Sequence, residues 1–554
     1  MRAEAIKRCL LLLVTAIVGC ASPVQPSTAP PMPGLVPLDG SSFRTHLAQV
    51  AGDTFEGRQP SSLAEQRTIT YIAAAFKDAG LTPGNGSDWF QQVPLVAVTA
   101  TQAGPMAVTG VGELRQREET VVWTKRLVER VALEDSELVF VGYGIVAPEY
   151  GWDDYAGVDV TGKTVVMLVN DPGFVGRDPA TFNGRAMTYY GRWTYKYDEA
   201  ARQGAAGALI IHETEAAGYP WDVVSGSWTG PQFDLIAPDR NMSRMAVEGW
   251  LQQDAARQVL VAAGQDPATL FAAAAQPGFS AAPLGLSMSV AINNTLEESL
   301  SNNVVGMVPG SRYPQETVIY MAHWDHLGRD PSLSGDQIYN GAVDNATGTA
   351  ALLEIARGFG AGSPPQRTIV FLSVTAEESG LLGSQYYVAN PIFPLETTVA
   401  GFNIDGMNVH GPTKDVVVVG YGSSDLEDDL RREATAQGRV VVPELTPEKG
   451  FFYRSDHFNF SKHGVPVLYA ESGIDHRQRG KSFGRRMAWE YNALRYHKVS
   501  DEYDPDWDLG GALEDMQLVY RIGWQLANTR AFPNWYTGTE FRAIRDASSA
   551  ARQP

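Results

Sequence analysis

Residues 318–328 read VIYMAHWDHLG, and the interpretation of the whole chain depends on them. An apolar run stops abruptly at His323, and Asp325 and His326 follow at once. The run is typical of a buried strand. Its polar end fits either an ordinary loop or a metal site, because imidazole and carboxylate groups are common metal ligands. The eleven residues leave both interpretations open, so the segments that follow have to decide between them.

From Asn302 onward, strand-like and helix-like segments alternate. TVIYMAHWD, RTIVFLSVTA, TVAGFNID and VPVLYAES are typical of strands, whereas NATGTAALLEIARGF and DMQLVYRIGWQLANT are typical of helices. This alternation predicts an α/β fold with a mostly parallel or mixed central sheet and helices on both faces. In such sheets, ligands bind beyond the carboxyl ends of the strands.

Polar residues gather at those predicted strand ends. They are His323, Asp344 before the first helix, the adjacent Glu377 and Glu378, Asp405, and a late His497. Two histidines with three carboxylates can hold two zinc ions if one carboxylate bridges them. A two-metal site suits hydrolysis, and one glutamate of the Glu377–Glu378 pair can remain free as a general base. Asp325 can orient His323 by accepting its second N–H.

The segments AHWDHLG, GAVDNATGTAALLEIAR, TAEESGLLGS and FNIDGMN, with His497, resemble the co-catalytic zinc aminopeptidase family, which also contains glutamate carboxypeptidases. This resemblance implies the role of each residue. His323 and Asp405 bind one zinc, Glu378 and His497 bind the other, and Asp344 bridges both. Glu377 is the general base, and Asp325 supports His323. In FFYRSDHFNF, the resemblance makes Tyr453, Asp456 and His457 candidates for contacting substrate or lying in a neighbouring shell.

The N-terminus resembles a bacterial lipoprotein signal. Three basic residues precede a short apolar run, and Ile17-Val18-Gly19 lead into Cys20, the expected lipidation residue. Cleavage there removes Cys9, the other cysteine, so disulfides and cysteine-ligated zinc are not expected. Ala21 and Ser22 follow, which resembles an outer-membrane address. We therefore expect an exported protein, anchored by lipid to a bacterial membrane and facing the periplasm.

Residues 121–282 differ in character, with VGYGIVAPEYGWDDYAGVDVTGKTVVMLVND and YDEAARQGAAGALIIHE resembling a protease-associated domain. The expected organisation is a signal peptide (1–19), a Pro/Ser-rich tether (20–38), a first catalytic segment (39–120), the inserted domain (121–282), a second catalytic segment (283–535) and a C-terminal tail (536–554).

These features predict a di-zinc exopeptidase, with an aminopeptidase ahead of a glutamate-carboxypeptidase-like enzyme. A glutaminyl cyclase with a single zinc and a non-catalytic binding protein are weaker alternatives. The expected partners are peptide substrates and a membrane, reached through the N-terminal lipid. The formal net charge of −19 argues against nucleic acid. The oligomeric state does not follow from the sequence.

Overall fold

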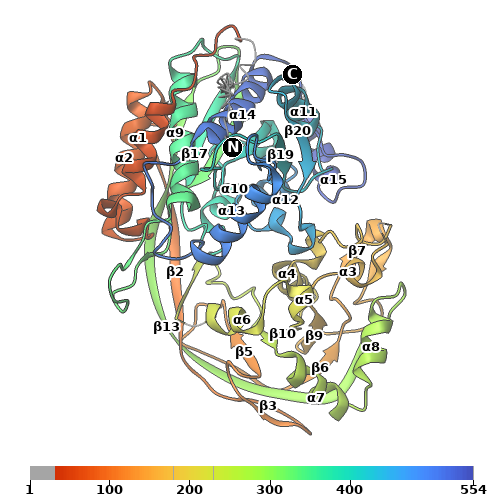
Figure 1. The fold of residues 1–554 in the computed structure, drawn as a ribbon. Coiled ribbons are helices and arrows are strands. Elements are labelled where there is room, and N and C mark those ends of the chain that lie inside the picture. Colours follow the sequence, from red (N-terminus) through yellow and green to blue (C-terminus); the bar gives the residue numbers. More distant parts are fainter. Residues whose placement is uncertain (1–31, 179, 229, 553–554) are drawn as a thin grey trace, which may run out of the picture.

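The structure is a computed structural model that describes residues 32–178, 180–228 and 230–552. The predicted signal peptide, Cys20 and most of the predicted tether lie outside these residues. The described chain forms two parts, which Figure 1 shows one above the other. We call them the main body (residues 32–95 and 297–552) and the insert (residues 96–296).

Two long strands link the main body to the insert. Strand β2 (Phe90–Ala103) pairs antiparallel with β13 (Ala282–Val308), and both run from one part into the other. The pairing extends from Phe90 opposite Val304 to Ala103 opposite Ile292. Because the two strands pair along this length, with one shift of register between Asn293 and Asn294, the insert is joined to the main body by continuous sheet.

The main body contains a mixed sheet. Strand β14 (Tyr313–His323) lies between β17 (Arg367–Val374) and β18 (Thr398–Asn403) and is parallel to both. Beyond β18 comes β21 (Val467–Ser472), also parallel, whereas β13 pairs antiparallel with β17. Strands β19 (Asp415–Val418) and β20 (Val440–Pro443) complete this side of the sheet. The predicted α/β fold with a mixed central sheet is confirmed.

Helices cover both faces of this sheet because its strands carry apolar side chains on both faces. On β14, Val318 and Tyr320 belong to one hydrophobic cluster, and Ile319 and Met321 belong to another. The first cluster includes residues of α1 (Gly40–Val50), α2 (Leu63–Asp78), α9 (Thr347–Gly360), α11 (Leu426–Ala436) and α14 (Gly510–Asn528). The second includes residues of α10 (Leu382–Ala389) and α12 (His457–Lys462).

The insert has hydrophobic clusters of its own. Its strands include β3 (Met106–Val108), β4 (Gly112–Leu114), β5 (Thr120–Trp123), β6 (Arg130–Phe140), β9 (Thr164–Leu168), β10 (Gly207–Ile211), β11 (Pro231–Leu235) and β12 (Val247–Leu251). Its longer helices are α4 (Trp193–Arg202), α7 (Gln253–Ala262) and α8 (Pro267–Ala274). Met106 and Ile292 lie in the same cluster as Phe140. The predicted boundaries at 121 and 282 therefore fall inside this core, because β3, β4 and β13 contribute to it.

Two further elements complete the main body. Helix α13 (Gly480–Leu494), which was not predicted, leads to His497. Helix α15 (Arg542–Ala547) lies in the predicted tail, where buried Arg545 donates hydrogen bonds to the carbonyl oxygens of Thr398 and Val399. Residues of the tail thus pack against the sheet. Among the described residues, no helix is both long enough and apolar enough to cross a membrane.

Candidate metal centre and active-site pocket

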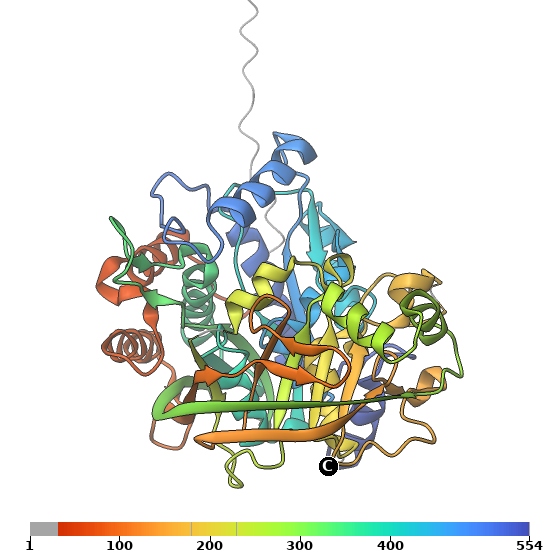
Figure 2. The ribbon, with the colours of Figure 1, turned by 90° about the horizontal axis from the view of Figure 1, so that it is seen from below.

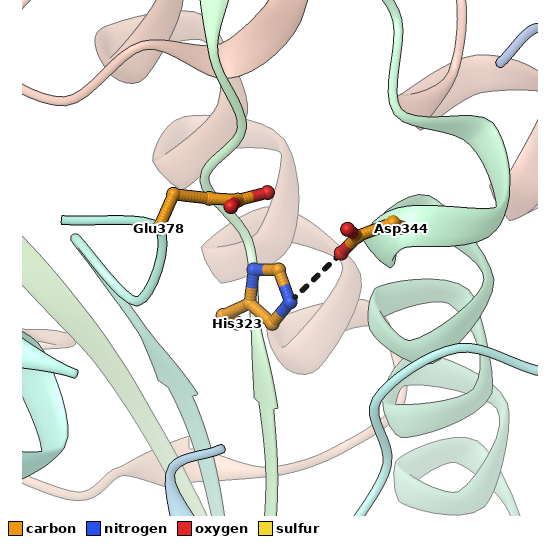
Figure 3. Close-up of side chains that lie close together, drawn as sticks. All are labelled: His323, Asp344 and Glu378. Atoms are coloured by element: carbon orange, nitrogen blue, oxygen red, sulfur yellow. Dashed lines mark ion pairs between the residues drawn. The ribbon is translucent and has the colours of Figure 1, made fainter. Parts of the chain in front are cut away.

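The five predicted metal ligands lie together at one edge of the sheet. His323 ends β14, Glu378 follows β17, and Asp405 follows β18. Because these strands are parallel, their carboxyl ends meet at the same edge. Asp344 joins them from the turn (Ala342–Ala346) before α9, and His497 from the loop after α13. Figure 3 shows His323, Asp344 and Glu378 converging, and one ligand atom of each lies within 4.8 Å of the others.

The distances divide the ligands into two halves that share Asp344. On one side, His323 Nε2 lies 3.2 Å from Asp405 Oδ1 and 3.3 Å from Asp344 Oδ1. On the other, His497 Nε2 lies 3.0 Å from Glu378 Oε2 and 3.2 Å from Asp344 Oδ2. The two carboxylate oxygens of Asp344 thus face different histidines. This arrangement suits one carboxylate bridging two metal ions.

The donor geometry fits a metal better than hydrogen bonds alone. His497 Nε2 is buried and close to two carboxylates, yet it makes no hydrogen bond of acceptable geometry with any described residue. A ring nitrogen aimed between two carboxylate oxygens is what an ion at that position would require. Neutral imidazole nitrogens and ionised carboxylates are also the donors that zinc accepts.

The electrostatics of the cluster are those of a cation site. Burial by itself would lower the pKa of His323, but Glu377, Asp344 and Asp405 raise this pKa well above its usual value. Burial would also lower the pKa of His497, but Glu378 and Asp344 raise this pKa to about 10. Both imidazoles therefore sit in a strongly negative field. Binding of a divalent cation would replace their protons.

Glu377 lies next to this cluster but outside it. Burial raises the pKa of Glu377 well above its usual value, and the nearby Asp405 and Glu378 carboxylates add to the rise. Glu377 also lines a pocket, together with Glu378 and His497. It thus lies where substrate would enter, with a carboxyl group that readily holds a proton.

Asp325 acts through a different atom from the one predicted. Its carboxylate is 3.8 Å from His323 Nδ1, beyond hydrogen-bond distance. The main-chain carbonyl oxygen of Asp325 lies 3.1 Å from that nitrogen instead. The carboxylate accepts hydrogen bonds from the backbone N–H groups of Glu377 and Glu378, at 3.1 and 3.3 Å. The side chain was predicted to orient the histidine, but it holds the strand end that carries the two glutamates.

Two buried residues for which no role was predicted hold the Asp344 turn. Asp501 accepts hydrogen bonds from the backbone N–H groups of Val343 and Asp344 at 3.1–3.2 Å. Asn345 donates from Nδ2 to the carbonyl oxygen of Ile404 and accepts from the backbone N–H of Gly406, both at 2.9 Å. The second contact ties the Asp344 turn to the loop of Asp405. In the sequence, Asn345 adjoins Asp344 and Asp501 lies close to His497, and nothing else distinguishes them. Because Asp501 comes 157 residues after Asp344, no local pattern predicts their contact.

Arg58, in the early DTFEGR segment, is a third residue of this kind. Its guanidinium is buried and donates to four backbone carbonyl oxygens, those of Val50, Trp324, Asn340 and Gly341, at 2.6–3.0 Å. Burial lowers its pKa to about 10, so it is charged at neutral pH. One side chain therefore fixes both the end of β14 and the approach to Asp344.

The three residues predicted from FFYRSDHFNF occupy different positions. Tyr453 lines the pocket, and its hydroxyl donates to the carbonyl oxygen of Met187, in the insert. Asp456 and His457 are fully buried and are not among the pocket-lining residues. Asp456 accepts a hydrogen bond from Ser384, and His457 packs against the Phe452 ring. A substrate-contacting role therefore fits Tyr453 only, while Asp456 and His457 support the wall behind it.

The pocket has a volume of about 340 Å³ and lies between the two parts of the molecule. The main body contributes Glu377, Glu378, Tyr453, Arg454 and His497, and the insert contributes Lys125, Arg192, Trp193, Trp228 and Arg244. Trp123 and Trp228 stack with ring centroids 3.6 Å apart on the insert side. A substrate at Glu377 would thus contact both parts.

Comparisons with known proteins agree with this site. Residues 303–520 match Peptidase family M28. Aminopeptidase NAALADL1 from Mus musculus is 38% identical over 138 residues, which cover 23% of this chain and 17% of that protein. Aminopeptidase YwaD from Bacillus subtilis (strain 168) is 27% identical over 167 residues, covering 30% and 34%. The matches thus span about a sixth to a third of these two relatives.

Among solved structures, an aminopeptidase from Aneurinibacillus sp. strain AM-1 aligns over 89% of this chain and 95% of its own, with 18% identity and a TM-score of 0.47. The family match is more local, and it contains every candidate ligand from His323 to His497. The residues of the candidate metal centre thus lie within the part of the chain, residues 303–520, that is similar to Peptidase family M28.

Proposed function

We propose that this protein is a zinc-dependent exopeptidase, and specifically an aminopeptidase that removes N-terminal residues from peptides. The observation that carries the proposal is the cluster in which Asp344 faces His323 with one oxygen and His497 with the other, beside Glu377. Two zinc ions are the proposed cofactors, with His323 and Asp405 holding one, Glu378 and His497 holding the other, and Asp344 shared. The similarity of residues 303–520 to Peptidase family M28 supports the same conclusion.

Zinc bound here supplies Lewis-acid chemistry and lowers the pKa of a water molecule. The chain's own residues do the rest. Glu377 accepts a proton from the attacking water and delivers it to the nitrogen of the leaving amine. The Asp325 carboxylate fixes the backbone of Glu377 and so keeps its side chain in place. Tyr453 and the tryptophans of the insert form the walls against which the peptide is positioned.

The insert is proposed to be a protease-associated domain that restricts the pocket to short peptides. It supplies Arg192, Trp193 and Trp228 to a pocket that the main body leaves open on that side. A peptide long enough to leave the pocket would have to pass between the two parts. Replacing Trp228 by Ala should therefore improve hydrolysis of long peptides relative to dipeptides. An unchanged ratio of kcat/KM values would argue against this role.

One observation favours the second candidate, a glutamate-carboxypeptidase-like enzyme. Arg192 from the insert and Arg454 from the main body both line the pocket, and neither forms an ion pair with a described residue. Burial lowers the pKa of Arg192 to about 10, and the nearby Arg454 charge contributes to this. Two guanidinium groups without carboxylate partners suit a substrate that carries a carboxylate.

A comparison of substrates separates the two candidates. A carboxypeptidase would lose activity on peptides with an amidated C-terminus, and Arg192→Gln or Arg454→Gln would raise its KM for free peptides. Arg202→Gln, at an exposed arginine at the end of helix α4, which begins just after Arg192, is the control. If amidated peptides are hydrolysed as fast as free peptides, and if both variants keep the wild-type KM, the two arginines do not bind a substrate carboxylate.

The cellular address is also a proposal. The signal-like start and Cys20 support export, lipid attachment and an outer-membrane position facing the periplasm. Labelling with a radioactive fatty acid should mark the wild-type chain and not the Cys20→Ser variant. Labelling of the variant would contradict lipidation at this residue.

The experiment that tests the main proposal is zinc content measured together with product analysis. We expect about two zinc ions per chain and chelator-sensitive release of N-terminal residues from a peptide mixture. Release from the C-terminus would favour the second candidate. One zinc with no amino acid released would instead favour a cyclase or a binding protein.

A further inference from the structure

Helix α13, which precedes the pocket-lining residues Tyr496 and His497, is largely exposed to solvent. Of its fifteen residues, only Phe483 is buried. Trp489 is 64% exposed and Leu494 is 56% exposed, and Tyr496, just after the helix, is 45% exposed. Single exposed apolar residues are ordinary on a protein surface, so these three gain meaning only from the charge that accompanies them.

The same segment is strongly basic on an acidic protein. Residues 479–498 contain six lysines and arginines against a single glutamate, whereas the chain as a whole has a net charge of −19. Arg486 lies 3.7 Å from that glutamate, Glu490. Lys481, Arg485 and Arg495 form no ion pair with any of the described residues. The segment therefore presents positive charge that the protein itself does not neutralise.

Charge and aromatic surface share one face of α13. Lys481, Arg485 and Trp489 follow each other at four-residue intervals, so their side chains stand in one row along the helix. All three are exposed. In Figure 2, helix α13 is the blue helix at the upper edge of the main body. A row of cations that ends in an exposed tryptophan on the outside of a molecule is suited to a broad, flat partner.

We propose that α13, together with Tyr496, is a docking surface for an anionic lipid membrane. Basic side chains attract the headgroups of such a membrane, and tryptophan and tyrosine favour its interface with water. A helix of fifteen residues with several charges is too short and too polar to span a bilayer, so it would lie on the surface. The proposal does not depend on the proposed function.

The docking surface is continuous with the pocket. Tyr496 is both an exposed residue and a pocket-lining residue, and its ring stacks on His497 with centroids 3.9 Å apart. A protein docked through α13 would therefore hold the mouth of the pocket close to the membrane surface.

Vesicle binding tests the proposal. We would use the chain from Ala21 onward, so that neither the signal segment nor an acyl group contributes, and measure co-sedimentation with vesicles of phosphatidylcholine alone or with added phosphatidylglycerol. The test variant is Arg485→Glu with Trp489→Ser. The matched control is Arg257→Glu with Val261→Ser, an exposed cation and an exposed apolar residue at the same spacing on α7. Thermal unfolding of each variant checks that it is folded, and Arg485→Glu alone replaces the double variant if that variant is not.

The expected result is binding to the anionic vesicles that is weakened by salt and falls by about tenfold or more in the α13 variant, but not in the α7 control. Equal binding by the α13 variant and the wild type would overturn the proposal. So would equal binding to vesicles with and without phosphatidylglycerol. If the wild type is a dimer in solution and the α13 variant a monomer, the surface is an interface between two copies, and the membrane proposal is wrong.

Discussion

At the scale of single residues, the candidate site depends on how six neighbouring side chains divide the chemistry. Asp344 faces two histidines with its two oxygens, and Glu378 and Asp405 each approach one of them. Glu377 is adjacent in sequence to Glu378 but does not approach either histidine as closely as a ligand would. The two glutamates are chemically identical, so their different roles follow from their positions. Successive side chains at the end of a strand point in different directions.

The first prediction concerns Glu377. Glu377→Gln should retain the zinc of the wild type, because the five ligand side chains are unchanged, but kcat should fall by about 10²–10⁴-fold as the general base is lost. Metal analysis and steady-state kinetics measure the two effects. Glu396→Gln, at an exposed glutamate, is the matched control. Near-normal turnover of Glu377→Gln would exclude Glu377 as the base.

At the scale of elements, the loops of the site are held by buried polar residues rather than by regular structure. Arg58, from the short helix at Asp53–Arg58, joins the end of β14 to the turn of Asp344 through backbone carbonyl oxygens. Asp501 and Asn345 hold the same turn from other directions. The position of Asp344 thus depends on three separate segments of the chain.

A second prediction follows for Arg58. Arg58→Lys keeps the charge but offers fewer donors, so buried carbonyl oxygens lose their partners, and the free energy of unfolding should fall by about 3 kcal/mol or more. Urea unfolding measures this change, and zinc affinity should fall with it. Arg67→Lys, at a half-exposed arginine on α2, should change stability by less than about 1 kcal/mol. Equal effects of the two substitutions would contradict the role given to Arg58.

The third prediction concerns His457, the first residue of α12. Burial lowers the pKa of His457 to about 3, from 6.5, so the unfolded chain binds a proton that the folded protein excludes. The stability contributed by the neutral imidazole is complete above pH 6.5 and is lost as the pH falls from there toward 3. Between about pH 7.5 and pH 5 this single group should cost about 2 kcal/mol.

His457→Phe removes that proton. The fall in the free energy of unfolding between these two pH values should therefore be smaller in this variant than in the wild type by about 2 kcal/mol. His463→Phe, at an exposed histidine just after the same helix, is the control. If the wild type and His457→Phe lose stability in parallel as the pH falls, His457 does not exclude a proton in the folded state.

At the scale of the whole molecule, the insert and the main body form one continuous structure. Strands β2 and β13 pass through both parts, and the pocket takes residues from each. Excision at the predicted boundaries 121 and 282 would leave Met106 and Leu114 without the core that buries them. The role of the insert is therefore better tested by point substitutions in the pocket than by deletion.

Metal binding should also stabilise the whole molecule. A ligand that binds only the folded chain adds about 4 kcal/mol when its concentration is a thousandfold above its Kd. A chelator should therefore lower the Tm by several degrees, and added zinc should restore it. Asp344→Asn, which removes the shared carboxylate, should show a much smaller difference between the two conditions. A wild-type Tm that is insensitive to chelator would argue against a metal held by this cluster.

The sequence predicted the general placement of the candidate site because parallel strands bring their carboxyl ends to one edge. Strand patterns before His323, Glu378 and Asp405 were enough to expect these residues together, and the structure places them within reach of one another. Their roles as zinc ligands stay predictions. The alternation of strands and helices likewise predicted the α/β fold, because the period of apolar residues is a local property of the chain.

The amino-acid sequence by itself determined which donor groups are present and at which strand ends they lie. Only the tertiary structure decided which atoms meet. It directs the Asp325 carboxylate to two backbone N–H groups and buries Asp456 and His457 behind the pocket wall. It also brings Arg58 to Trp324, and Asp501 to Asp344, across 266 and 157 residues. Such contacts carry no local periodicity. They depend on how distant segments pack, and no pattern within a single segment encodes that packing.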